Sequence, residues 1–185
     1  MLEIKNVHKT FNKGTINEKK ALNGVDLKLA PGDFVTIIGG NGAGKSTMLN
    51  MIAGVYPIDQ GTILLDGKDI SDLPEYKRAY MLGRVFQDPM MGTAAGMEIQ
   101  ENMAMANRRG KRRGLNWGIS KKEKKMFKEK LATLDLGLED RMTSKVGLLS
   151  GGQRQALTLL MATLKKPSLL LLDEHTAALD PKTAK

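Results

Sequence analysis

Hydrophobic and polar residues alternate along the first thirty positions of the chain. Leu2 and Ile4 stand between polar neighbours, and residues 25–29 (VDLKL) repeat the same period of two. This period predicts strands with one buried face. The run 34–38 (FVTII) is instead almost continuously apolar or β-branched. Such a run is typical of a central strand that is buried on both faces.

The pattern then passes through glycine into a helical stretch. Six residues at 39–44 are mostly glycine, and a helical pattern follows from Lys45 to about Ala53, where Gly54 predicts its end. Further strands are predicted over 61–66, which closes on an Asp-Gly turn signal, and over 83–87.

Helical signals dominate from residue 88 to about residue 146. Ser120 and Glu123 form the S-x-x-E pattern of a capping box, which predicts a helix start. Another helix is predicted over 153–164 and a second buried strand over 168–172. Strands that alternate with helices indicate an α/β protein, and the helical middle part indicates an insertion into it.

Composition adds three limits to this picture. The hydrophobic share of 41% is ordinary for a globular chain and sufficient for a core, although aromatic residues make up only 4%. The chain has no cysteine, which excludes disulfides and cysteine-ligated metals and fits a cytosolic protein. No apolar run approaches the roughly 20 residues of a membrane helix, and the charged start does not resemble a signal peptide.

Positive charge is concentrated in one stretch. Residues 108–130 contain eleven Lys or Arg and two Glu, which accounts for the formal net charge of +9 of the whole chain. A solvated helix face is one interpretation, and attraction to anionic lipid headgroups is another. Nucleic-acid binding is not expected, because the stretch has one aromatic residue in its basic half, Trp117, and no recognisable reading module.

The glycine-rich segment GGNGAGKS matches G-x-x-x-x-G-K-[ST] between a predicted strand and a predicted helix. In such a loop backbone N–H groups converge on phosphate oxygens, and the helix N-terminus adds a positive dipole end. Lys45 is expected to reach the β- and γ-phosphates of ATP, Ser46 to bind Mg²⁺ and Thr47 to meet the α-phosphate. The expected nucleotide contacts are Gly39, Gly40, Asn41, Gly42, Ala43, Gly44, Lys45, Ser46 and Thr47.

A second anion-binding pattern stands before the helix predicted over 153–164. It consists of Leu149, Ser150, Gly151, Gly152 and Gln153. A serine hydroxyl, exposed glycine amides and a helix N-terminus are again the groups that attract an anion. One chain therefore carries two such sites, separated by the helical insertion.

Together these motifs resemble those of the ABC (ATP-binding cassette) ATPases. The resemblance implies an α/β fold: a RecA-like P-loop NTPase core with an N-terminal antiparallel β-subdomain and an inserted helical subdomain. Residues 1–87 and 149–185 would form the core, and 88–148 the insertion. In this family two subunits pair head to tail, and the serine-glycine motif of each covers the γ-phosphate bound by the other.

The resemblance also assigns single residues. Asp173, after the run of four leucines, would hold Mg²⁺ through water, and Glu174 would be the general base for the attacking water. Asp180 would communicate across the dimer, and Gln87 would sense Mg²⁺ and the γ-phosphate. Phe11 would stack on adenine; its alternative is an ordinary core phenylalanine.

The sequence departs from the family pattern at two places. His175 follows Glu174 where many relatives have proline, and a structural role is expected for it. Relatives also continue beyond Asp180 to a histidine that contacts the γ-phosphate, whereas this sequence ends at Lys185. A C-terminally truncated chain with doubtful hydrolytic activity is therefore expected.

The expected function is to power a membrane transporter, in the manner of bacterial uptake ATPases for small solutes such as amino acids. The expected partners are a transmembrane permease, a second ATP-binding subunit and, for an importer, a solute-binding protein, at the cytoplasmic face of the membrane. Methionines 90, 91, 97, 103 and 105 suit either permease docking or a helical core. The alternative is a soluble ABC ATPase of DNA maintenance or translation, whereas a nucleotide kinase would lack the serine-glycine motif. Sequence leaves the substrate, the transport direction and homo- or heterodimerisation open.

Overall fold

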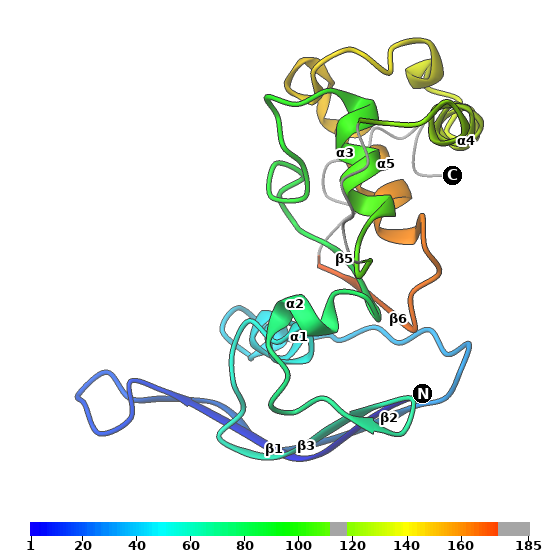
Figure 1. The fold of residues 1–185 in the computed structure, drawn as a ribbon. Helices are drawn as coiled ribbons and strands as arrows, with labels where there is room; N and C mark the ends of the chain where they lie inside the picture. The colour runs from blue at the N-terminus through cyan, green and yellow to red at the C-terminus, as the bar shows by residue number, and fades with distance from the viewer. Residues whose placement is uncertain (112–117, 174–185) are drawn as a thin grey trace. The chain divides into compact units, whose positions relative to one another are not determined.

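The computed structural model describes residues 1–111 and 118–173. The chain forms two compact units, Met1–Leu82 and Gly83–Lys185, whose elements are labelled in Figure 1. In the described part of the chain, no helix is long and apolar enough to cross a membrane. The predicted division into a core and a helical insertion over 88–148 stays a prediction.

The first unit is built on an antiparallel sheet in the order β2-β1-β3-β4. Its strands are β1 Leu2–Phe11, β2 Lys19–Leu29, β3 Gln60–Leu65 and β4 Lys68–Asp69. In the central strand, Leu2 lies opposite Leu29 on one side and Leu65 on the other. Asp66 and Gly67 both adopt positive φ and turn β3 into β4. The strands expected from the alternating pattern are thereby confirmed as an antiparallel β-subdomain.

Helix α1, Lys45–Ala53, supplies the other half of this unit's core. Its bounds agree with those predicted from the sequence, and Gly54 ends it in the left-handed conformation. Met48, Met51 and Ile52 of the helix are buried. They share an apolar interior with side chains of the sheet such as Ile4 and Ile63. Burial of this helix face from water holds α1 to the sheet.

The strand predicted over 34–38 is not formed. Residues 33–40 have no strand assignment, and Phe34 and Ile38 are 85% and 90% exposed. A strand needs the backbone of a neighbour to satisfy its N–H and C=O groups. Among the described residues, the two sheets pair only other segments, so apolar character alone does not place this one.

Arg78 is the largest fully buried side chain of the first unit. It closes the short helix α2, Glu75–Arg78. Its guanidinium donates to the carbonyl oxygens of Met51 (2.7 Å), Ile52 (3.0 Å), Leu73 (2.6 Å) and Ser71 (2.8 Å). Two of these carbonyls belong to the last turn of α1. Arg78 therefore satisfies the C-terminal end of the helix that begins at the glycine-rich loop.

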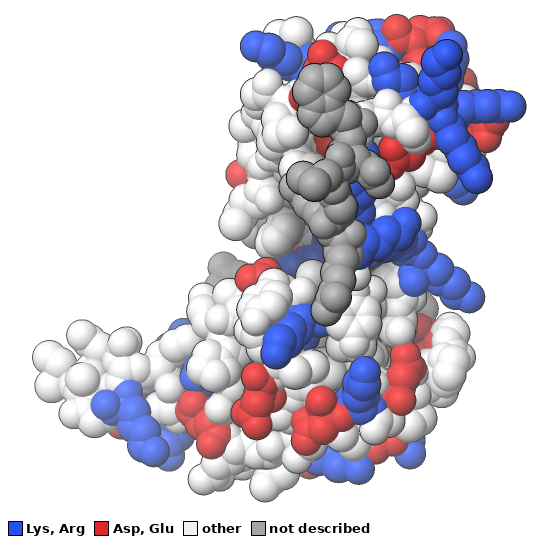
Figure 2. All heavy atoms as spheres, viewed as in Figure 1, with Lys and Arg blue, Asp and Glu red and all other residues white. Residues whose placement is uncertain are grey.

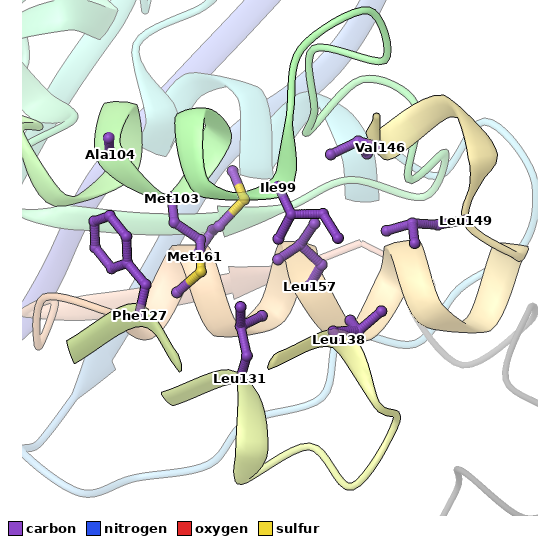
Figure 3. Close-up of a cluster of buried hydrophobic side chains, with 10 residues drawn as sticks. All are labelled: Ile99, Met103, Ala104, Phe127, Leu131, Leu138, Val146, Leu149, Leu157 and Met161. Carbon is purple, nitrogen blue, oxygen red and sulfur yellow. The ribbon is translucent and has the colours of Figure 1, made fainter. Parts of the chain in front are cut away.

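The second unit combines a small sheet with helices. Strands β5 Leu82–Val85 and β6 Leu169–Leu172 pair with each other. The helices are α3 Ile99–Asn107, α4 Lys121–Ala132 and α5 Gly151–Thr163, with 3₁₀ turns at Leu138–Asp140 and Val146–Leu148. Figure 3 shows how Ile99, Phe127, Leu131 and Leu157 from the three helices meet in one apolar cluster. Met103 is fully buried there, so this methionine belongs to the helical core.

Helix α4 separates an apolar stripe from a basic face. The predicted capping box is present: Ser120 accepts from the Glu123 amide, and Glu123 accepts from the Ser120 amide. Phe127 and Leu131 face the cluster, while the lysines of the helix are exposed or nearly so. Figure 2 shows Lys and Arg side chains gathered over this helix. The lysines of α4, which belong to the positive stretch of the sequence, therefore lie on the surface.

Replacing Arg78 by methionine is expected to destabilise the fold strongly. The change keeps most of the buried volume but removes the donors of two buried and two partly buried carbonyl groups, at a cost of about 3 kcal/mol of unfolding free energy. Urea unfolding measures this loss. The control is Lys77→Met at the exposed preceding residue. Equal unfolding free energies for the two variants would contradict the role given to Arg78.

Candidate nucleotide-binding site

The site begins with the close approach of Gly44 to the sheet. Gly44 is buried, has φ +90° and precedes the first residue of α1. A Cβ at this position would lie 2.6 Å from the carbonyl oxygen of Ala21 and 2.9 Å from the Leu22 side chain. Only glycine meets both conditions. It makes no side-chain cap, which leaves the first amides of α1 for another acceptor.

Lys45 folds back across the glycine-rich loop. Its Nζ donates to the carbonyl oxygens of Gly39 at 2.6 Å and Gly40 at 3.1 Å. The amide of Ala43 also donates to Gly40, at 3.2 Å. Through these bonds residues 39–45 form a closed turn, and the Lys45 ammonium group lies across it. Ser46 and Thr47 follow in the first turn of α1, where the helix dipole is positive.

A second ammonium group, that of Lys19, stands at the same loop. Its Nζ lies 3.3 Å from the place where a Cβ on Gly42 would be. Lys19 is also the partner of Phe11 in the register of β1 and β2. Sequence reasoning missed this residue, because a lysine in a basic strand end carries no motif. Through Lys19, the aromatic end of β1 and the phosphate loop belong to one region of the first unit.

Phe11 is in contact with a second ring. The Phe11 and Tyr56 centroids are 5.3 Å apart with an interplanar angle of 83°, an edge-to-face pair. The Lys9 ammonium lies 5.7 Å from the Phe11 centroid, within cation–π range. Phe11 and Tyr56 are half-buried. Phe11 is thus a held and partly exposed ring at the end of β1, rather than a buried core residue.

Asp59 fastens the end of β1 to the turn before β3. Its carboxylate accepts from Lys9 Nζ at 2.9 Å and from the Thr10 amide at 2.6 Å. The Lys9 and Thr10 hydrogen bonds lower the pKa of the Asp59 carboxyl, against the opposing effect of burial. This ion pair therefore stabilises the fold above the ordinary aspartate pKa, and its contribution is lost as the pH falls through the lowered pKa.

In the second unit, two predicted site residues follow neighbouring strand ends. The Asp173 amide donates to the Val85 carbonyl at 3.2 Å, which joins the C-terminal ends of β6 and β5. Gln87 stands two residues beyond Val85 and is exposed. Side chains at such strand ends are where open α/β sheets bind ligands. Glu174, His175 and Asp180 lie outside the described residues.

The serine-glycine motif forms the start of α5. Ser150 is the N-cap, its Oγ accepts from the Gln153 amide at 3.2 Å, and the Gln153 side chain accepts from the Ser150 amide at 3.2 Å. Leu149 is buried in the apolar cluster, whereas Ser150 and Gly151 are exposed, Gly152 is half-buried, and a Cβ on Gly151 would have open space around it. The Ser150 hydroxyl can still donate its proton to an anion.

Arg154 stabilises the turn that precedes this motif, although in the sequence it is indistinguishable from an ordinary helical arginine. It is 9% exposed, and its guanidinium donates to the carbonyl oxygens of Val146 (3.2 Å) and Gly147 (3.1 Å) and contacts the Met90 sulfur. Those carbonyls belong to the 3₁₀ turn that leads into Leu149. Arg154 therefore connects α5 to the turn before the motif and to the segment after Gln87.

The residues of the first unit fit the phosphates of a nucleotide. A loop curled around a lysine ammonium, an uncapped helix start and the nearby Lys19 all favour negative charge. Phe11 adds a ring at the strand end opposite Lys19, suited to a flat heterocycle. Ser46 offers a hydroxyl for Mg²⁺, and Asp173 a carboxylate, each described within its own unit. The roles predicted for these residues stay predictions.

Comparison with known proteins agrees with this geometry. Residues 22–177 match the family model described as ABC transporter. The chain is 44% identical over 184 residues to a tyrosine transport ATP-binding protein of Clostridioides difficile, covering 100% of this chain and 73% of that protein. It is 36% identical over 196 residues to a methionine import ATP-binding protein of Clostridium acetobutylicum, covering 100% of this chain and 54% of that one.

Solved structures give the same result for the fold. A dimeric ATP-binding cassette in a post-hydrolysis state, bound to ADP and Pi, matches with a TM-score of 0.82 and 32% identity, over 99% of this chain and 78% of that one. A second cassette, in its ADP conformation, matches with a TM-score of 0.77 and 29% identity, over 100% and 72%. The motifs, the antiparallel β-subdomain and these matches lead to one conclusion: the chain belongs to the ABC transporter family and has the ATP-binding cassette fold.

Proposed function

We propose that this chain binds Mg-ATP and is the ATP-hydrolysing subunit of a membrane ABC transporter. The observation that carries the proposal is the phosphate loop, in which Lys45 lies across the carbonyls of Gly39 and Gly40 and α1 starts without a cap. Lys45 binds the β- and γ-phosphates, Thr47 the α-phosphate, and Ser46 and Asp173 hold the metal. Mg²⁺, when bound, neutralises charge that develops on the phosphoryl oxygens.

Hydrolysis is assigned to residues of the second unit. Glu174 orients the attacking water and accepts a proton from it, and Gln87 senses Mg²⁺ and the γ-phosphate. The serine-glycine motif presents a hydroxyl, glycine amides and the positive end of α5, which suits a γ-phosphate. We assign it to the nucleotide of a second copy or a paralogous subunit, paired head to tail. The dimeric cassette among the similar structures supports the pairing of two subunits.

The cargo we propose is a small solute such as an amino acid, taken up through a permease at the cytoplasmic face of the membrane. Relatives named for tyrosine transport and methionine import support this class. Direction is less constrained by the relatives, because one at 37% identity is an ATP-binding protein of a lipoprotein-releasing system of Acinetobacter baylyi. Exposed Met90 and Met91, after Gln87, form an apolar surface suited to a permease helix.

Lys45→Ala is expected to weaken Mg-ATP binding by roughly tenfold or more, because it removes a charge-assisted contact of about 1.5–3 kcal/mol. Titration calorimetry of the wild type and the variant measures the change. Lys77→Ala, at an exposed lysine of α2, is the control and should bind as the wild type does. Equal affinities for all three proteins would refute the assignment of the phosphate loop.

Glu174→Gln is expected to bind ATP without hydrolysing it and so to accumulate an ATP-dependent dimer. Adding Ser150→Asp should return the protein to the monomer, because aspartate still caps α5 but places a negative charge against the partner's γ-phosphate. Light scattering after size exclusion reports the mass. The matched control is Ser168→Asp, at an exposed serine outside the motif. A Glu174→Gln protein that stays monomeric with saturating ATP would argue against the shared site.

A further inference from the structure

Tyr56 occupies a position that neither the motifs nor the expected roles explain. It lies in the turn between α1 and β3, where its amide donates to the Asn50 carbonyl at 3.4 Å. Its ring is half-buried and makes the edge-to-face contact with Phe11, at 5.3 Å and 83°. An aromatic pair of this kind restricts the orientation of both rings.

Three hydrogen bonds join the chain segment that carries Tyr56 to the strand end that carries Phe11. Asp59 accepts from the Thr10 amide and from Lys9, and its own amide donates to the His8 carbonyl at 2.9 Å. Asp59, three residues after Tyr56, therefore joins this turn to residues 8–10 of β1. With Lys9 near the Phe11 ring as well, the surroundings of Phe11 come from its own strand end and from the turn 56–59.

The aromatic pair also lies at the end of the first unit where the glycine-rich loop is found. Phe11 is opposite Lys19 in the sheet, and the Lys19 ammonium stands 3.3 Å from the Cβ position of Gly42. A ligand whose phosphates occupy the loop would extend its base toward this strand end. A flat ring meeting Phe11 gains most if the phenyl ring is already oriented before binding, because no rotamer freedom is then lost.

We propose that Tyr56 is a positioning residue for recognition of the base: it orients Phe11 so that Phe11 stacks on the purine, while Asp59 holds the strand end in register. The inference rests on the proposed function, since it takes the nucleotide phosphates to bind in the loop. It assigns to the turn 56–59 a part in base affinity and no part in phosphate binding.

The test separates base contacts from phosphate contacts. Tyr56→Leu, Tyr56→Phe and the control Tyr76→Leu, at a tyrosine that is 74% exposed, are titrated calorimetrically with Mg-ATP and with Mg-tripolyphosphate, which has no base. Tyr56→Leu is expected to bind Mg-ATP about three- to tenfold more weakly, in line with an aromatic pair, and tripolyphosphate within about twofold of wild type. Tyr56→Phe, which keeps the ring, should retain most of the affinity, as should the control.

Phe11→Leu and the double variant complete the test. Phe11→Leu should show the same selective loss, and adding Tyr56→Leu to it should cost little more, because the two residues act through one contact. Equal weakening of both ligands by Tyr56→Leu would indicate a general structural role and overturn the proposal, as would unchanged ATP affinity. If Phe11→Leu leaves ATP binding intact, the base platform itself is wrong. If the wild type binds neither ligand, the proposed function fails first.

Discussion

The site depends on the absence of one side chain. Gly44 brings the backbone at the start of α1 so close to Ala21 of β2 that a Cβ would lie 2.6 Å from its carbonyl oxygen. This approach places α1 on the sheet and directs the lysine after it across the loop. Met51 and Ile52 of the same helix reach the interior, and Arg78 holds their carbonyls. Sheet, helix and loop are thus one structural unit, joined at a close approach that only glycine allows.

The two helix starts that carry the motifs differ in how their first backbone amides are satisfied. At α1 the N-cap is a glycine without a side-chain bond, so its first amides are available to a ligand. At α5 the N-cap is Ser150, which already accepts from Gln153 and keeps a hydroxyl proton to donate. The first end suits a ligand that is held by many amides. The start of α5 suits a nucleotide that is bound by another subunit and contacts the motif only through its terminal phosphate, as in the arrangement proposed for the dimer.

Features that rest on local chemistry could be predicted from the sequence, and features that rest on distant contacts could not. The phosphate loop, the bounds of α1 and the capping box at Ser120 follow from residue types at short spacing, and the structure has them. Residues 34–38 failed as a strand because a strand requires a partner and apolar character does not supply one. Arg78, Lys19, Tyr56 and Arg154 look like surface residues in the sequence. The partners of Arg78 and Arg154 are mainly backbone carbonyls, which leave no trace in composition. The groups near Lys19 and Tyr56 belong to other segments of the chain.

The bonds of Lys45 to Gly39 and Gly40 make ligand entry an exchange of partners. An incoming anion has to compete with two carbonyl oxygens that already accept from the ammonium. A weakly basic, singly charged anion such as chloride gains little over those carbonyls, whereas a polyphosphate brings several charged oxygens at once. The folded-back lysine therefore favours anions of high charge density over singly charged anions. Abundant monovalent salt can surround such a loop without occupying it.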